Sequence, residues 1–323
     1  MITYKKATTD DIRPAFDLIE KVWKDSGFGK FDVLQKSVTQ NAEEFEKYAS
    51  GEHIMFVAQA DKSIVGVIGA DDTGFIHELF IDGAFERRGV ATELLSRVVC
   101  ELKIRGIDVI RLGSSRRAIT FYEKYGFIKT GEEQLINGFV TTPMEYKPNE
   151  IWDILNENGN KTGRLHERGK PMASGDYHII VHVWKRNPKG EWLIDKRTPR
   201  YGNGELDGKW ETTGGCVIAG EDSFTAALRE TKEELGIDLD PKKGVLFNRF
   251  ARLGSNGHTW FEDIWVFEFD EPIGSVAYDG SEVCDAMWAT ADKIREMMSS
   301  GEFLSEWFYP YLNEMFEKWG AVK

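Results

Sequence analysis

Cysteine is scarce in this chain, and so are long apolar runs and an excess of basic charge. Three cysteines stand far apart among 323 residues, and this odd number and wide spacing argue against a disulfide framework and against a zinc knuckle. No apolar run reaches the roughly 18 residues of a membrane span, and the first residues lack the pattern of a secretion signal. We therefore expect a cytoplasmic protein without a membrane partner.

The charge balance is acidic, with a formal net charge of −13. Residues 1–147 contain 20 Lys and Arg against 23 Asp and Glu, whereas residues 148–323 contain 21 against 31. Neither half has the broad basic surface that binds a nucleic acid polymer. Small anionic molecules remain as partners, because a metal ion and local basic groups can bind them.

The length exceeds one ordinary hydrophobic core and suits two domains of about 150 residues each. A strand pattern before Pro148 gives way to a Pro-Asn break and then to another strand pattern. We place the boundary there, with domains at 1–147 and 148–323. The polar, glycine-rich segment 160–177 lies between alternating strands, which predicts a long loop inside the second domain.

The first domain alternates between helix and strand patterns. Helices are expected at 10–25, 32–49, 89–105 and 116–125, and strands at 2–8, 53–60, 63–70, 75–82 and 108–114, followed by two final strands. Strands interleaved with helices predict a mixed sheet covered by helices, so the fold class is α/β (α+β).

Residues 215–237 contain a dense group of carboxylates on a predicted helix. Phe224, Leu228, Thr231 and Leu235 fall within one sector at the helical period. On the opposite face lie Glu230, Glu233 and Glu234. Three carboxylates at this spacing repel one another, and a hard cation with oxygen ligands compensates for the repulsion.

This stretch resembles the Nudix box, G-x5-E-x7-R-E-U-x-E-E-x-G-U, where U is a bulky apolar residue. The matching positions are Gly215, Glu221, Arg229, Glu230, Glu233, Glu234, Gly236 and Ile237, with Thr231 as a weaker match at an apolar position. The resemblance implies an α/β/α sandwich that hydrolyses a diphosphate linked to another group. It also implies that Mg²⁺ or Mn²⁺ is bound by Glu230, Glu233 and Glu234, while Arg229 and Glu221 hold the helix and the loop in register.

The general base differs among members of this family, and Glu233 and Glu234 are the leading candidates. A further acid from outside the box is expected to be one of Glu262, Asp263 and Glu282, which the sequence does not rank. The segments 150–164 and 175–184 are similar to the isopentenyl-diphosphate-isomerase-like branch of Nudix proteins, so isomerisation is the alternative. In isomerases a catalytic cysteine is expected at the position of Gly215, and Cys216 stands one residue beyond. Hydrolysis is therefore favoured.

A short glycine loop precedes the predicted helix 89–105 of the first domain. The unpaired backbone N–H groups of a helix N-terminus, together with the helix dipole, form an anion site. Residues 118–127, AITFYEKYGF, look like the A-x-x-F-Y-x-K-x-G-F segment of GNAT acyltransferases. This resemblance implies that acetyl-CoA is bound at Leu79, Ile81, Arg87, Arg88, Gly89, Val90 and Ala91. It also implies that Tyr122 protonates the departing thiolate.

Two features leave the chemistry of the first domain open. Glu86 stands where the GNAT family usually has Gln or Arg, which brings a negative charge near the diphosphate. A non-catalytic domain that only binds acyl-CoA is therefore the alternative to an N-acetyltransferase with an amine acceptor. Glu78 and His77 are candidates for the general base. Strand alternation points them to opposite faces, and Glu78 is preferred.

Overall fold

The computed structural model describes residues 2–26, 42–136, 139–199, 206–255, 257–278 and 280–320. The chain forms two compact units, one of Met1–Ile151 with Leu165–Lys170, the other of Trp152–Arg164 with Pro171–Lys323. The boundary between residues 147 and 148 stays a prediction. No helix in the described ranges is both long enough and apolar enough to span a membrane.

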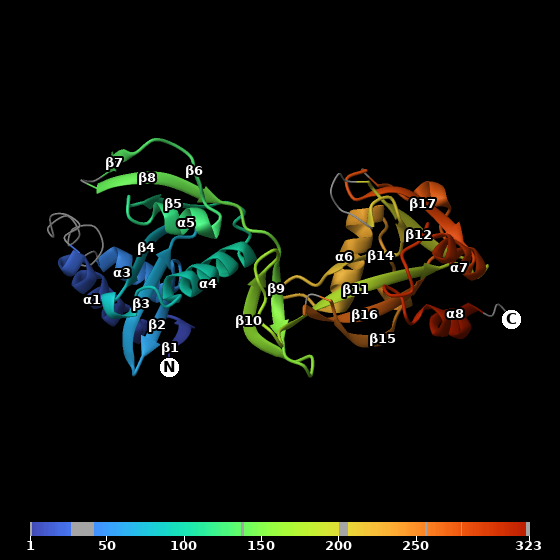
Figure 1. Cartoon of the computed structure of the whole chain (residues 1–323), viewed down its shortest axis with the longest axis horizontal. Coiled ribbons are helices and arrows are strands. Elements are labelled where there is room, and N and C mark those ends of the chain that lie inside the picture. Colours follow the sequence, from blue (N-terminus) through green and yellow to red (C-terminus); the bar gives the residue numbers. More distant parts are fainter. Residues whose placement is uncertain are drawn as a thin grey trace. The chain divides into compact units, whose positions relative to one another are not determined.

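A mixed sheet forms the centre of the first unit (Figure 1). Its strands are β1 (Ile2–Lys6), β2 (Ile54–Ala60), β3 (Ser63–Ala70), β4 (Phe75–Ile81), β5 (Ile110–Ser114), β6 (Ile128–Lys129), β7 (Gln134–Ile136) and β8 (Phe139–Tyr146). They run in the order β1-β2-β3-β4-β5-β8-β6, with β7 paired to β8. The β4–β5 pair is parallel, and its neighbours β3–β4 and β5–β8 are antiparallel.

Helices cover both faces of this sheet. They are α1 (Thr9–Ser26), α3 (Ala42–Ser50), α4 (Val90–Ile104) and α5 (Ile119–Tyr125). On one face, α1 and α3 bury Phe16, Ile19 and Tyr48 against the sheet. On the other face, α4 buries Val90 and Leu94. The predicted mixed sheet covered by helices is confirmed; the part of helix 32–49 before residue 42 lies outside the described residues.

The second unit is a sheet between helices. Its strands are β9 (Ile151–Leu155), β10 (Lys161–Glu167), β11 (Tyr177–Arg186), β12 (Trp192–Arg197), β13 (Trp210–Glu211), β14 (Thr213–Cys216), β15 (Gly244–Leu253), β16 (Thr259–Glu268) and β17 (Val283–Ala289). One face packs against α6 (Ser223–Leu235), and the other against α7 (Ala291–Ser300) and α8 (Leu312–Gly320). The α/β/α sandwich is confirmed.

The long loop expected at 160–177 is wrong for residues 161–167, which form β10. Among the described residues, this strand pairs with β9 alone, at the edge of the sheet, and most of its side chains are exposed. An exposed edge strand needs no apolar alternation, so its polar sequence gave no strand signal. Its last residue, Glu167, accepts hydrogen bonds from the Tyr146 hydroxyl and the Asn149 N–H, within the first unit.

Candidate functional site

Helix α6 has a defined start and a defined end. The Asp222 carboxylate caps its first turn by accepting a hydrogen bond from the Thr225 N–H at 2.8 Å. Gly236 ends it with a φ of +68°, a left-handed conformation that glycine adopts without strain. Thr231, the weaker match of the box, is fully buried, and its hydroxyl donates to the Ala227 carbonyl at 2.8 Å. A threonine fits this apolar position because its polar group is satisfied inside the helix.

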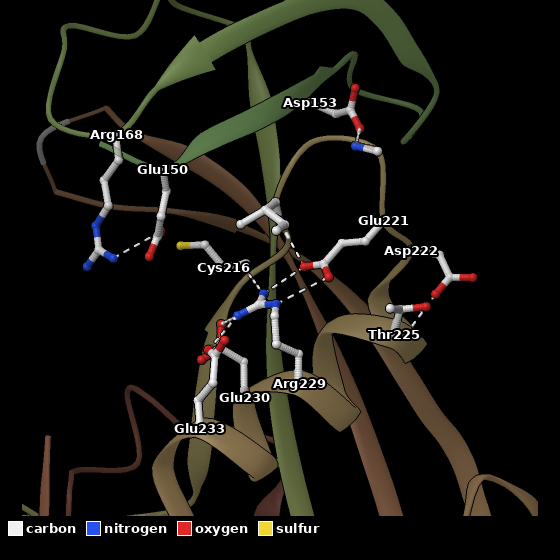
Figure 2. Close-up of polar contacts among 12 residues, drawn as sticks. Glu150, Asp153, Arg168, Cys216, Glu221, Asp222, Thr225, Arg229, Glu230 and Glu233 are labelled. Atoms are coloured by element: carbon white, nitrogen blue, oxygen red, sulfur yellow. Dashed lines mark hydrogen bonds and ion pairs between the residues drawn. The ribbon is translucent and has the colours of Figure 1, made fainter. Parts of the chain in front are cut away.

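Arg229 is the point where three predicted carboxylates meet (Figure 2). Its guanidinium donates to Glu221 at 2.6 Å, to Glu230 at 2.8 Å and to Glu233 at 3.0 Å. It also donates to the carbonyl of Cys216 at 3.0 Å, which ties α6 to the end of β14. Three carboxylates around one guanidinium leave an excess of two negative charges at this place.

Gly215 lets the Glu230 carboxylate lie directly against the backbone of β14. A Cβ atom at Gly215 would come within 2.2 Å of the Glu230 carboxyl carbon. The preceding Gly214 is equally constrained, because a Cβ there would lie 2.5 Å from the Val181 carbonyl oxygen. Gly215 is therefore needed for the close approach of β14 to α6, and Gly214 for the close approach of β14 to β11.

Glu234 has a different environment from the other carboxylates of α6. Burial, together with the charges of Asp195, Glu211 and Glu230, raises the pKa of the Glu234 carboxyl well above its usual range. The Lys185 ammonium opposes this effect. Burial and the Asp195 carboxylate also raise the pKa of Glu211 to about 7. Glu234 of α6 therefore interacts with a second group of carboxylates, formed by Asp195 of β12 and Glu211 of β13.

The second group includes a buried ion pair that sequence reasoning missed. Lys185 and Asp195 are both completely buried, with Nζ and Oδ2 3.9 Å apart. The Thr213 hydroxyl lies between them, accepting from Lys185 at 2.5 Å and donating to Asp195 at 2.8 Å. A signal was present in the sequence. Lys185 follows Val181 and Val183 at inward positions of β11, where a charged residue needs a partner.

These donors fit a hard divalent cation. Carboxylate oxygens are the ligands of Mg²⁺, and the excess of negative charge around Arg229 matches a double positive charge. The Asp195 Oδ1 atom is buried without a hydrogen-bond partner among the residues that the structure describes. Nowhere among the described residues are three His, Cys, Asp or Glu side chains already grouped so that they could hold a metal ion.

The structure separates the three acids considered outside the box. Asp263 is completely buried and bonded twice to Arg249, at 2.5 and 2.6 Å. Glu262 is the neighbour of Asp263 in β16, so its side chain lies on the opposite face of the sheet, which packs against α7 and α8. There its carboxylate accepts from the Trp260 ring N–H at 3.0 Å. Glu282, in contrast, contributes to the raised pKa of Glu211. Glu282 is therefore the acid that lies near the second group.

In the first unit, the predicted anion site stands at the start of α4. Gly89 is the N-terminal cap residue of this helix, with a φ of +80°, and Arg87 also has a positive φ of 57°. Arg88 lies over the Phe85 ring, with its guanidinium carbon 5.1 Å from the ring centroid. Val90 is buried under the helix, whereas Gly89 is exposed. The first N–H groups of α4 thus lie at the surface of the loop.

Strands β4 and β5 part after a short pairing. Phe75 pairs with Arg111 and Ile76 with Leu112, and the recorded β4–β5 ladder ends there. Leu79 and Ile81 lie on the later part of β4, which still pairs with β3. Tyr122 of α5 is buried in the core on the α4 face, and burial raises the pKa of its phenol.

The expectation that His77 and Glu78 point to opposite faces is wrong. In the β3–β4 ladder Gly69 pairs with Glu78 and Ala70 with Ile76, so His77 is an extra residue in a β-bulge. The His77 ring stacks on the His53 ring at 6.0 Å. The His53 ring in turn contacts Tyr48, whose hydroxyl donates to Glu78 at 2.6 Å. Both candidate bases therefore belong to one cluster.

Comparison with known proteins decides the family. A family model described as a NUDIX domain matches residues 176–308, and one described as an acetyltransferase (GNAT) domain matches residues 22–148. An uncharacterized Nudix hydrolase of Listeria innocua is 36% identical over 175 residues, which cover 52% of this chain and 94% of that protein. The chain belongs to the Nudix family. Its first half is a GNAT domain, so the recognition of a GNAT–Nudix fusion is confirmed.

Two further relatives represent the two halves of the fusion. An uncharacterized N-acetyltransferase of Methanocaldococcus jannaschii is 26% identical over 151 residues, covering 43% of this chain and 64% of that protein. An isopentenyl-diphosphate Delta-isomerase of Streptomyces avermitilis is 26% identical over 167 residues, covering 50% of this chain and 82% of that protein. Together with the family models and the Listeria relative, these matches describe a fusion of a Nudix hydrolase domain and a GNAT acetyltransferase domain, types of domain that act on small molecules.

Glu86, the departure from the GNAT pattern, has a partner in the structure. The Arg117 guanidinium donates to both Glu86 carboxylate oxygens, at 3.0 and 2.9 Å. We expect Arg117→Ala to raise the Kd for acetyl-CoA about fivefold, because an exposed ion pair contributes up to about 1 kcal/mol. The Arg117→Ala/Glu86→Gln double variant should restore the wild-type Kd. Calorimetric titration measures both, and equal loss in the single and double variants would show that Arg117 acts by another route.

Proposed function

We propose that this protein is bifunctional. Its Nudix domain hydrolyses a diphosphate linked to another group, of the nucleoside-diphosphate-X type, with Mg²⁺ or Mn²⁺. Its GNAT domain transfers an acetyl group from acetyl-CoA to an amine. The observation that carries the hydrolase proposal is the convergence of Glu221, Glu230 and Glu233 on Arg229 in a chain whose Nudix box is intact.

In the hydrolase, Glu230, Glu233 and Glu234 would bind the cation. When bound, a divalent cation neutralises the diphosphate and lowers the pKa of a coordinated water. Arg229 and Glu221 hold α6 against the loop that follows β14, since Arg229 bonds to Glu221 and to the Cys216 carbonyl. Glu233 or Glu234 would accept the proton of the attacking water. Glu233 is the more exposed of the two and lies at the surface of the helix.

A substrate screen with Mg²⁺ tests the hydrolase. Nucleotide sugars, dinucleotides, modified nucleoside triphosphates, CoA and prenyl diphosphates cover the linked groups that Nudix enzymes meet. We expect at least one compound to be cleaved at its diphosphate, with activity lost in EDTA and regained when Mg²⁺ is added in excess. Cleavage that continues unchanged in EDTA would contradict the metal-dependent mechanism.

Isomerisation of isopentenyl diphosphate is the second candidate for the Nudix domain. It is favoured by the likeness to an isopentenyl-diphosphate Delta-isomerase at 26% identity. The intact box and the glycine at position 215 favour hydrolysis instead. Formation of the allylic isomer from isopentenyl diphosphate, without release of phosphate, would establish the isomerase.

For the GNAT domain, the parting of β4 and β5 supports acetyl-CoA as the cosubstrate. The open edge of β4 at Leu79 and Ile81 suits the pantetheine arm, and the loop from Arg87 to Ala91 suits the diphosphate. A tyrosine phenol carries its proton at neutral pH, as a proton donor to the thiolate requires, and burial raises the pKa of Tyr122 further. The alternative is a domain that binds acetyl-CoA without turnover, and acetyl-CoA binding without thiol release would favour it.

A further inference from the structure

His77 occupies the point of β4 where the sheet opens. The recorded β4–β5 pairs end at Ile76, one residue earlier, and His77 is the extra residue of the bulge against β3. A bulge leaves its extra residue outside the regular ladder and re-aims its side chain. The His77 side chain is 38% exposed, so a molecule from solvent can reach it.

Asp71 holds the His77 imidazole through one hydrogen bond. The Asp71 Oδ2 atom lies 2.9 Å from His77 Nε2. Its other oxygen, Oδ1, accepts from the Thr73 N–H at 2.9 Å, the Thr73 hydroxyl at 2.7 Å and the Phe75 N–H at 2.9 Å. Burial alone would raise the pKa of Asp71, but these hydrogen bonds and His77 lower it. An ionised Asp71 therefore fixes the proton of His77 on Nε2 and leaves Nδ1 as the acceptor nitrogen.

Glu78 is much less accessible. The residue is 5% exposed, and its Oε2 atom accepts from the Tyr48 hydroxyl at 2.6 Å. The same oxygen lies so close to Gly69 that a Cβ atom there would be 2.3 Å away. Glu78 is thus enclosed between α3 and β3. A base that takes a proton from an incoming amine must reach that amine directly or through one water, and the exposed His77 imidazole offers more access than the enclosed Glu78 carboxylate.

We propose that His77, oriented by Asp71, is the general base of acetyl transfer, and that Glu78 instead anchors Tyr48. The proposal rests on the acetyltransferase function proposed above. The amine nitrogen attacks the thioester carbonyl carbon, the C–N bond forms and the C–S bond breaks. The proton of the amine passes to His77 Nδ1, and the leaving thiolate takes the Tyr122 proton. His53, Tyr48 and Glu78 are the other polar groups of the cluster around the imidazole.

Kinetics of the full-length protein test this assignment. Thiol release from acetyl-CoA is measured with spermidine, benzylamine and Nα-acetyl-lysine as probe amines. We expect His77→Gln to lower kcat by about 10²–10³-fold, as loss of a general base does, with the Kd for acetyl-CoA unchanged within about twofold. Asp71→Asn should lower kcat by about tenfold and move the acidic limb of the kcat/KM profile. Asp72→Asn, which removes a neighbouring exposed charge, is the matched control and should match wild type.

Two results would overturn the assignment. One is a His77→Gln protein with near wild-type kcat while Glu78→Gln is inactive. The other would come from long-range ¹H–¹⁵N spectra. If the proposal is right, these spectra show His77 as the Nε2–H tautomer, and its Nδ1 resonance shifts when acetyl-CoA is added. An Nδ1 resonance indifferent to acetyl-CoA contradicts the proposal even without an active amine. Acetyl-CoA binding with the expected Nδ1 shift but no thiol release from any amine would instead count against the acetyltransferase function.

Discussion

Glu233→Gln and Glu234→Gln are each expected to lower kcat for metal-dependent diphosphate hydrolysis by about 10³-fold, a barrier increase of about 4 kcal/mol. Each change replaces one carboxylate oxygen, a ligand for the cation, by an amide nitrogen while it keeps the shape of the side chain. The Glu234 carboxyl lies near Asp195, Glu211 and Glu230, where burial and these charges raise its pKa and a cation would compensate for the charges. The Glu233 carboxylate shares Arg229 with Glu221 and Glu230.

Binding and turnover are measured separately to distinguish a lost ligand from a lost base. Titration with Mn²⁺, followed by its electron paramagnetic resonance signal, should show weaker ion binding for a variant that has lost a ligand. A variant that binds Mn²⁺ normally but turns over slowly has lost a proton acceptor. Asp238→Asn is the matched control, because this exposed carboxylate just beyond α6 pairs with Lys232. Wild-type turnover in either Glu variant would remove that residue from the site.

The box could be predicted from sequence because its determinants are local. Helical periodicity places Leu235 on the buried face, and the terminal glycine marks where the helix ends. Both follow from residues within four turns of one another. The reason for Gly215 needed the structure, since the Glu230 carboxylate fills the space of a Cβ atom only after β14 packs on α6.

Contacts between different elements account for the features that sequence periodicity did not predict. The alternation rule assigned His77 and Glu78 to opposite faces, and it failed because β3 pairs with β4 through a bulge. Similarly, Arg117 lies just before α5, 31 positions after Glu86, and forms an ion pair with it. No local period encodes such contacts. Local patterns therefore located the helices and strands that carry the candidate residues, but not the orientation and partners of those side chains.

Lys185→Met is expected to destabilise the Nudix domain by about 3–5 kcal/mol, because it leaves the Asp195 carboxylate buried without its counter-ion. Both side chains are completely buried, and the Thr213 hydroxyl would keep only its bond to Asp195. Burial lowers the pKa of Lys185 to about 8 and raises the pKa of Asp195, and the charge of each group opposes the shift of the other. Nine of the ten tryptophans lie beyond residue 148, so tryptophan fluorescence during urea unfolding follows this domain.

The double variant Lys185→Met/Asp195→Leu separates the ion pair from simple packing. Removing both charges should recover most of the lost free energy of unfolding, because apolar residues of similar volume replace a buried ion pair at little cost. Lys189→Met in the exposed turn after β11 is the control and should stay within about 0.5 kcal/mol of wild type. If the double variant is as unstable as Lys185→Met alone, the loss comes from the lysine's packing. The charge on Asp195 would then have no part in it.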